Sequence, residues 1–180
     1  ATAQRRPATV DSDRSRFDVE SYTIDVTLKP AEHTLRAIAD VKFRQLERAS
    51  YLTFDLDNRL KVEKVTLDGA EARFRQYDLD STVEVSTAEG QLSNVSTVRF
   101  EYEGFLDPPG SKRAAVLSSI SENGAYLLYE SKWFPMNELY KYKAAATVTV
   151  HVPADWIVVS DMPGSGEKFS STVASYWGLV

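Results

Sequence analysis

The sequence predicts an all-β fold, an antiparallel β-sandwich. Apolar and polar residues alternate with a period of two along most of the chain, as in strands that have one buried and one solvated face. These runs recur about every 8 to 12 residues and are separated by turn sequences such as Asp68-Gly69 and Asn123-Gly124. No window longer than about ten residues has the 3.6-residue period of a helix, although residues 111–120 come nearest to it.

The first two strands are predicted to form an antiparallel hairpin. Alternation begins at Phe17, a turn follows at Pro30, and alternation resumes as far as Phe43. Two such strands joined by a short polar loop are typical of a hairpin. The side chains expected on its buried face are Tyr22, Ile24, Val26, Leu28, Leu35, Ala37, Ala39, Val41 and Phe43.

The later strands follow the same pattern, with alternating runs at residues 52–56, 62–67, 83–85, 98–102 and 148–152. Residues 156–159 are continuously apolar, which predicts a further short strand, and residues 172–180 are rich in β-forming residues. Because the body contains no linker, repeat or low-complexity tract, we expect one domain over residues 17–180. Residues 1–16 hold hardly an apolar side chain and are expected to form a flexible leader.

The composition excludes several kinds of active site. The 180 residues contain no cysteine, which rules out disulfides, thiolate metal sites and a cysteine nucleophile. His33 and His151 lie too far apart in sequence to form the His-x-x-x-His pair of a helical zinc site. Gly164-Ser165-Gly166 is one residue short of the Gly-x-Ser-x-Gly elbow of serine hydrolases, so a simple turn is its expected role. We therefore expect no catalytic residue and no metal ligand set in this chain.

The charge pattern argues against nucleic-acid and membrane partners. Acidic residues outnumber basic ones by 26 to 21, and the two signs are interspersed. The Tyr-Lys-Tyr-Lys sequence at 140–143 has the composition of a stacking platform for single-stranded nucleic acid, but strand alternation would separate its tyrosines from its lysines. No stretch reaches the roughly 18 consecutive apolar residues that a membrane span needs.

A freestanding binding module for carbohydrate or protein is an alternative function for such a sandwich. A sugar-binding module would stack its ligand on an aromatic side chain, and the candidates are Trp133, Trp156 and Trp177. Packing in a core or an interface is the more common use of tryptophan. The module therefore stays an alternative that the residues themselves do not favour.

The most unusual local sequence covers residues 127–136. It places Glu130 between a strongly apolar strand and the aromatic-proline corner Trp133-Phe134-Pro135. A carboxylate there is either a solvated edge residue or a group that binds a cationic ligand by charge-assisted hydrogen bonds. Because acidic side chains are mostly exposed, the residues alone favour the solvated edge.

This corner resembles a segment of the amino-terminal domain of the M1 zinc aminopeptidases, the gluzincin family that includes leukotriene A4 hydrolase. Those domains carry Phe-Pro-Cys-x-Asp-Glu-Pro-x-x-Lys-Ala before a strand that ends in proline, and residues 134–144 and 148–153 follow this order. Residues 159–163, Val-Ser-Asp-Met-Pro, resemble the family's Leu-Ser-Asn-Met-Pro. Met136 replaces the family's cysteine and Glu138 its aspartate, which suggests a divergent bacterial branch.

The resemblance implies a saddle-like sandwich that forms one wall of a substrate cleft. In the family, a Gln or Glu upstream of the corner binds the free α-amino group of the peptide substrate. Glu130 is the nearest chemical match to that residue, whereas a gapless count reaches Tyr126. The resemblance thus implies Glu130 as the substrate-binding residue and a peptide amino terminus as its ligand.

The resemblance also implies that the catalytic machinery lies outside this chain. The His-Glu-x-x-His zinc motif of the family belongs to its next domain, and this chain stops on the apolar run 176–180, where that domain would begin. We expect zinc in a downstream catalytic domain, that domain as the partner, and an extracytoplasmic location. A family member that has lost catalysis and kept the architecture as a scaffold is a further alternative.

Overall fold

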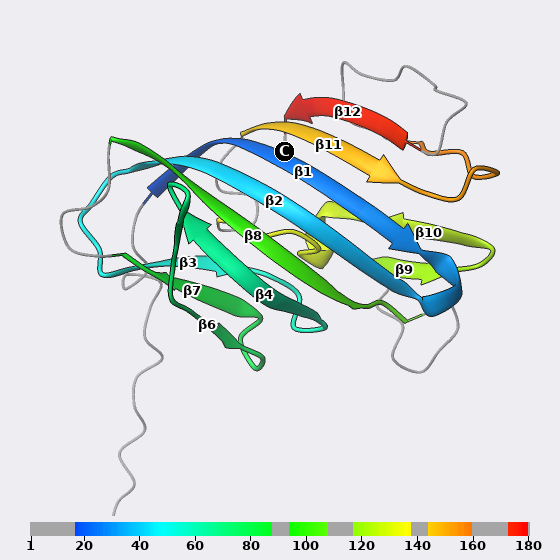
Figure 1. Cartoon of the computed structure of the whole chain (residues 1–180), viewed down its shortest axis with the longest axis horizontal. Helices are drawn as coiled ribbons and strands as arrows, with labels where there is room; N and C mark the ends of the chain where they lie inside the picture. The colour runs from blue at the N-terminus through cyan, green and yellow to red at the C-terminus, as the bar shows by residue number, and fades with distance from the viewer. Residues whose placement is uncertain (1–16, 88–93, 108–116, 138–143, 160–172, 180) are drawn as a thin grey trace, which may run out of the picture.

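A curved seven-stranded sheet organises the fold of the computed structural model (Figure 1). The strand order is β12-β11-β1-β2-β8-β4-β5, and the strands are β1 (Phe17–Lys29), β2 (Thr34–Gln45), β4 (Leu60–Leu67), β5 (Ala70–Glu71), β8 (Val95–Phe105), β11 (Ala145–His151) and β12 (Val173–Leu179). The structure describes residues 17–87, 94–107, 117–137, 144–159 and 173–179, the last of these by its backbone alone.

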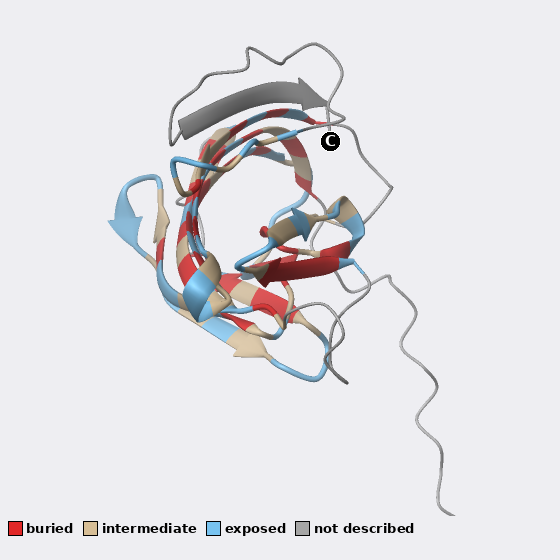
Figure 2. Cartoon of the chain, turned by 90° about the vertical axis from the view of Figure 1, so that its right-hand side faces the viewer, coloured by how far each residue is buried: buried red, intermediate tan, exposed pale blue. Residues whose placement is uncertain are grey.

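Two smaller sheets lie on the concave side of the large sheet (Figure 2). The strands of the three-stranded sheet are, in order, β3 (Tyr51–Asp55), β7 (Thr82–Ser86) and β6 (Phe74–Tyr77). The two-stranded sheet is a hairpin of β9 (Ser118–Ser121) and β10 (Gly124–Leu127). Short 3-10 helices, η2 (Pro30–Glu32) and η3 (Tyr129–Ser131), follow β1 and β10. The prediction of an all-β sandwich is confirmed.

The predicted hairpin of β1 and β2 is also confirmed. The two strands are antiparallel, with Ile24 opposite Ala39, and every side chain predicted for the inner face is buried. One pairing departs from the antiparallel expectation, because β11 runs parallel to β1 with Val148 beside Ile24. Parallel neighbours need a long crossover connection, and here most of the chain lies between them.

An aromatic cluster joins the large sheet to the three-stranded sheet. Phe54 on β3 lies between Phe17 on β1 and Phe100 on β8, with ring centroids 5.0 Å from each. Phe43 on β2 extends the cluster, with its ring centroid 5.3 Å from that of Phe17. These four rings are almost completely buried, so their packing sets the position of β3 relative to the large sheet.

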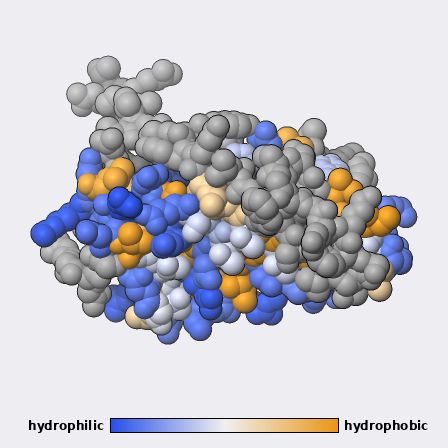
Figure 3. Space-filling model, turned by 90° about the horizontal axis from the view of Figure 1, so that it is seen from above, coloured by the Kyte–Doolittle hydropathy of each residue, from blue (hydrophilic) through white to orange (hydrophobic). Residues whose placement is uncertain are grey.

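Charged residues cover the solvated face of the large sheet in cross-strand pairs. Arg99 contacts Asp40 across β8 and β2 at 2.6 and 2.7 Å, and Arg44 contacts Glu20 across β2 and β1 at 2.8 Å. Hydrogen bonding from Arg44 lowers the pKa of Glu20 below its ordinary value. The described surface in Figure 3 is likewise mostly hydrophilic, with scattered hydrophobic residues. Exposed pairs of this kind contribute little to stability, and they mark this face as solvated.

One predicted strand is wrong, and two further predictions fall wholly or partly outside the described residues. The strand predicted at 156–159 is wrong: these residues have no strand partner, and Ile157 and Val159 are 79% and 84% exposed. A turn precedes this run, in which Trp156 N–H donates to the Pro153 carbonyl. In the helical candidate 111–120, the described end belongs to β9, and the rest lies outside the described residues, as does the predicted leader 1–16. Within the described residues, no helix is long and apolar enough to span a bilayer.

Replacing Phe54 by alanine should lower the free energy of unfolding by about 3 to 5 kcal/mol, because the substitution leaves a cavity between the two sheets. Denaturant unfolding followed by tryptophan fluorescence measures this loss. Tyr51→Ala is the matched control, since Tyr51 lies on the same strand but is 40% exposed, and its effect should stay below about 1 kcal/mol. Equal losses in the two variants would contradict the role assigned to the Phe54 contacts.

Candidate functional site

The segment that carries Glu130 is a short turn at the end of the β9–β10 hairpin. After β10 the chain stays extended at Leu128, forms η3 over Tyr129–Ser131, and ends it at Lys132 in the left-handed region. The Leu128 carbonyl accepts hydrogen bonds from the Ser131 N–H at 3.1 Å and from the Ser131 hydroxyl at 2.7 Å. Lys132 N–H donates to the Tyr129 carbonyl at 3.2 Å. The turn is therefore closed by its own hydrogen bonds.

The aromatic-proline corner that follows is buried rather than displayed. Trp133, Phe134 and Met136 belong to the core, and the Phe134 ring packs edge-on against Trp133 at 5.0 Å and Tyr22 at 5.2 Å. Tyr129 completes the cluster with its ring centroid 6.0 Å from that of Phe134. Burial of this cluster gives the turn a rigid support.

Backbone hydrogen bonds attach the corner to the end of β3. Asp55 and Met136 exchange two of them, at 2.7 and 2.9 Å, as in an antiparallel bridge. Asp57 N–H donates to the Lys132 carbonyl at 2.9 Å, and the Asn137 side chain donates to the Phe17 carbonyl at 2.7 Å. The corner thus behaves as an added edge of the three-stranded sheet.

Both residues considered for substrate binding lie at the surface. Glu130 is exposed in the middle of η3, while the next residue, Ser131, is buried. Tyr126 is 40% exposed on β10, opposite Ser119 of β9. Exposure of Glu130 agrees with the solvated edge that the residues alone favour. Substrate binding by Glu130 stays a prediction.

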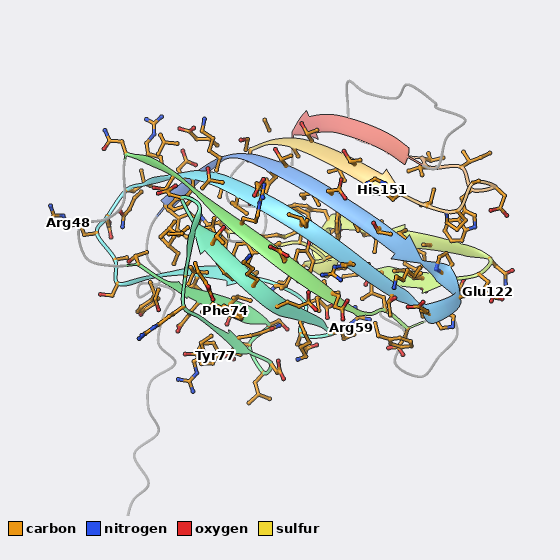
Figure 4. All side chains as sticks on the ribbon, in the orientation of Figure 1. Arg48, Arg59, Phe74, Tyr77, Glu122 and His151 are labelled. Atoms are coloured by element: carbon orange, nitrogen blue, oxygen red, sulfur yellow. The ribbon has the colours of Figure 1, made fainter. Side chains whose placement is uncertain are left out.

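A polar group beside the corner was not foreseen. Arg59, which is labelled in Figure 4, donates to both carboxylate oxygens of Asp57, at 2.9 and 2.6 Å, and to the Ser118 hydroxyl at 3.0 Å. Hydrogen bonding to Asp57 raises the pKa of Arg59, so the guanidinium stays charged. Gly104 on β8 permits this arrangement, because a Cβ there would collide with the Arg59 carbonyl. The Asp-x-Arg spacing was the only available sequence signal, and it is too common to predict the contact with β9.

Within the described part of the chain, neither histidine belongs to a group of three or more side chains that could hold a metal ion. His151 Nε2 lies 3.0 Å from Asp25 Oδ2 on the neighbouring strand, and it is labelled in Figure 4. His33 Nδ1 lies 2.8 Å from the Ile120 carbonyl, and this side chain is half-buried. Among the described residues, no cluster of three or more His, Cys, Asp or Glu fits a metal ion.

The other candidate residues are distributed as follows. Trp133 is buried in the corner, and Trp156 is partly buried against the core. The side chain of Trp177 lies outside the described part of the chain, as do the candidate sequences at 140–143 and 164–166. Trp133 therefore does not present the open ring face that sugar stacking requires.

The whole arrangement is similar to parts of larger peptidases of known structure. No protein-family model and no curated protein sequence matches the chain. The M1 zinc metallopeptidase of Deinococcus radiodurans has 22% identity and a TM-score of 0.61 over 92% of this chain. The fold is that of an M1 aminopeptidase amino-terminal domain. Yeast LTA4 hydrolase, in a structure with bestatin, has 14% identity and a TM-score of 0.61 over 98% of this chain.

The likeness is confined to part of each neighbour. The chain covers 39% of the Deinococcus radiodurans enzyme and 29% of yeast LTA4 hydrolase. A two-domain M1 zinc metallopeptidase bound to L-arginine gives a TM-score of 0.62 with 20% identity, and this chain covers 40% of it. The sequence prediction of the M1 amino-terminal fold is confirmed at the level of the fold.

Tyr22 attaches the corner to β1, and the contribution of its hydroxyl group to stability can be tested. The hydroxyl is hydrogen-bonded to the backbone of Asn137, and burial raises its pKa above the ordinary value. Tyr22→Phe should lower the free energy of unfolding by about 1 kcal/mol, because that hydrogen bond is lost. Denaturant unfolding at neutral pH measures the change.

Tyr102 on β8 provides the matched comparison for Tyr22. Its side chain is fully buried, and its hydroxyl has no hydrogen-bond partner among the described residues. Tyr102→Phe should therefore leave stability unchanged or raise it by up to about 1 kcal/mol, since an unpaired buried polar group is removed. A larger loss for Tyr102→Phe than for Tyr22→Phe would contradict both assignments.

Proposed function

We propose that this chain is the non-catalytic amino-terminal domain of a zinc-dependent M1 aminopeptidase and forms a wall of its substrate cleft. One observation carries the proposal: the M1-like fold extends over 89% to 98% of this chain but over only 26% to 40% of the neighbours. A chain that matches one portion of a larger enzyme throughout its own length is expected to work as that portion. The partner in the proposal is the catalytic domain of the same protein.

Glu130 is the residue that we propose to bind the substrate. It is exposed on a turn whose flanking residues, Ser131 and Trp133, are buried, so the carboxylate sits on a fixed support at the surface. A carboxylate binds an ammonium group through charge-assisted hydrogen bonds, which are about twice as strong as neutral ones. The free α-amino group of a peptide is the ligand that this chemistry fits, and the structural neighbours include an M1 enzyme bound to the peptide Tyr-Ser-Ala.

The described residues do not themselves fit a zinc ion, because they hold no suitable cluster of His, Asp or Glu. In the proposal, zinc belongs to the catalytic domain, where it would polarise the scissile carbonyl and activate water. The contribution of this chain is to bind and orient the amino end of the peptide. Orientation of this kind reduces the entropy that the reaction must otherwise lose.

A carbohydrate-binding module receives no support from Trp133. Trp133 is 8% exposed and packs edge-on against Phe134 within the corner. A stacking platform needs an aromatic face open to the ligand. The aminopeptidase domain is therefore the function that the observations support best.

Replacing Glu130 by alanine in the full-length protein should raise KM for unblocked aminoacyl substrates by about 10- to 100-fold, because a charge-assisted hydrogen bond is lost. Chromogenic aminoacyl substrates assayed with zinc measure this change. Glu122→Ala is the matched control, since Glu122 is also exposed but lies in the β9–β10 turn, and its KM should stay unchanged.

Different results would overturn the role of Glu130 and the assignment of the domain. An unchanged KM for Glu130→Ala would remove the substrate-binding role and leave the domain assignment intact. The absence of a His-Glu-x-x-His motif downstream in the reading frame, or of aminopeptidase activity in the full-length protein, would remove the assignment to a zinc aminopeptidase.

A further inference from the structure

We propose that Lys132 and Asp55 are positioning residues for Glu130. Their ion pair holds the turn η3, which carries Glu130, against the end of β3. The functional part of this inference rests on the proposed role of Glu130, whereas its structural part stands on the contacts alone.

Three contacts of Lys132 together join the turn to the end of β3. Its N–H donates to the Tyr129 carbonyl at 3.2 Å and closes the turn. Its carbonyl accepts from the Asp57 N–H at 2.9 Å, and its ammonium group donates to Asp55 Oδ1 at 3.2 Å. The first contact holds Lys132 to the turn, and the other two hold it to the last residue of β3 and to the chain just after it.

Of the three contacts, only the one between the Lys132 ammonium group and Asp55 requires a lysine side chain, because the other two are made by the backbone. The Asp55 side chain is only 6% exposed, and the Lys132 side chain is 31% exposed. A buried carboxylate needs a cationic or hydrogen-bonding partner, and removing one partner of such a pair costs far more than removing a surface pair. The Asp55/Lys132 pair therefore resists separation of the turn from β3.

The backbone of Lys132 supports the same conclusion. Its φ of 55° and ψ of 39° are left-handed, a conformation that costs energy for a lysine and that glycine adopts freely. The helix could end at this residue with glycine and without strain. A lysine in this position is therefore accounted for by the contact of its ammonium group with Asp55.

Glu130 depends on this attachment because it lies within the same turn. η3 spans three residues and ends at Lys132, so its orientation follows from what holds its two ends. Leu128 N–H donates to the Leu117 carbonyl at 2.9 Å and holds the entry to the turn, while Lys132 holds the exit. Release of the exit would let the Glu130 carboxylate move relative to the corner, and small displacements of a binding group weaken binding strongly.

Amide hydrogen exchange of the 180-residue chain tests the structural part. Lys132→Met removes the ammonium group and should speed exchange of the Ser131, Lys132 and Asp57 amides by about tenfold or more, while amides of β1 and β2 keep their rates. Lys61→Met is the control, because it removes an exposed ion pair away from the turn, in which Lys61 Nζ lies 2.7 Å from Asp78 Oδ1. Lys132→Gly removes the ammonium contact and also relieves the backbone strain. Slower amide exchange in Lys132→Gly would show that the contact does not hold the turn, and unchanged exchange in Lys132→Met would show the same. Either result would overturn the inference.

Steady-state kinetics of the full-length protein tests the functional part. Lys132→Met should raise KM for unblocked substrates by about tenfold with kcat within about twofold, and Lys132→Arg should recover most of the loss. Because Lys132 acts through Glu130, adding Lys132→Met to Glu130→Ala should change KM by less than about twofold. Additive effects, or failure of arginine to restore KM, would overturn the positioning role. If the full-length protein proved inactive, the proposed function would fail while the exchange experiment still decided the contact.

Discussion

The structure depends on the contact of one strand, β3, with the large sheet. Phe54 on β3 packs between Phe17 and Phe100, while Thr53 and Asp55 on its other face are also buried. A strand buried on both faces cannot shift in register without exposing apolar rings or burying the wrong polar groups. The corner that follows Lys132 is attached to the end of this strand, so the aromatic contact also determines where Glu130 lies.

Left-handed residues recur where the chain must be tied to another element. His33 ends η2, and its Nδ1 lies 2.8 Å from the Ile120 carbonyl of β9. Asp68 occupies the β4–β5 turn, and its carboxylate accepts from the Thr97 N–H of β8 at 2.8 Å. Lys132 ends η3 and contacts Asp55. In these three cases the strain is offset by a polar side chain that reaches a separate element, which glycine could not supply. The left-handed Ser81 instead makes its contact through its backbone carbonyl, which accepts from the Leu56 N–H at 2.9 Å.

Alternation along the sequence predicted the buried faces of the long strands, whereas contacts between side chains far apart in the chain were not predicted. The period-two pattern predicts the buried faces of β1 and β2 because alternation depends only on the strand itself. The same pattern does not predict the burial of Asp55, which depends on Lys132 and on the corner far along the chain. It overpredicts a strand at 156–159, because apolar composition does not specify a neighbour with which to pair. The corner was found from its aromatic-proline sequence, whereas the contact of Arg59 with Ser118 depends on tertiary structure.

The support beneath Glu130 accounts for how a three-residue turn can position a charged group. A 3-10 helix of this length has little stability of its own, because its hydrogen bonds are few and poorly aligned. Here it lies between two fixed points, the β9–β10 hairpin before it and the end of β3 after it, over a buried aromatic cluster. Each fixed point belongs to a sheet that packs on the concave face, so the turn inherits the rigidity of the core while Glu130 itself is exposed. A binding group supported in this way can meet its ligand without first losing conformational freedom, which is the physical advantage of a rigid β-domain beside a separate catalytic centre.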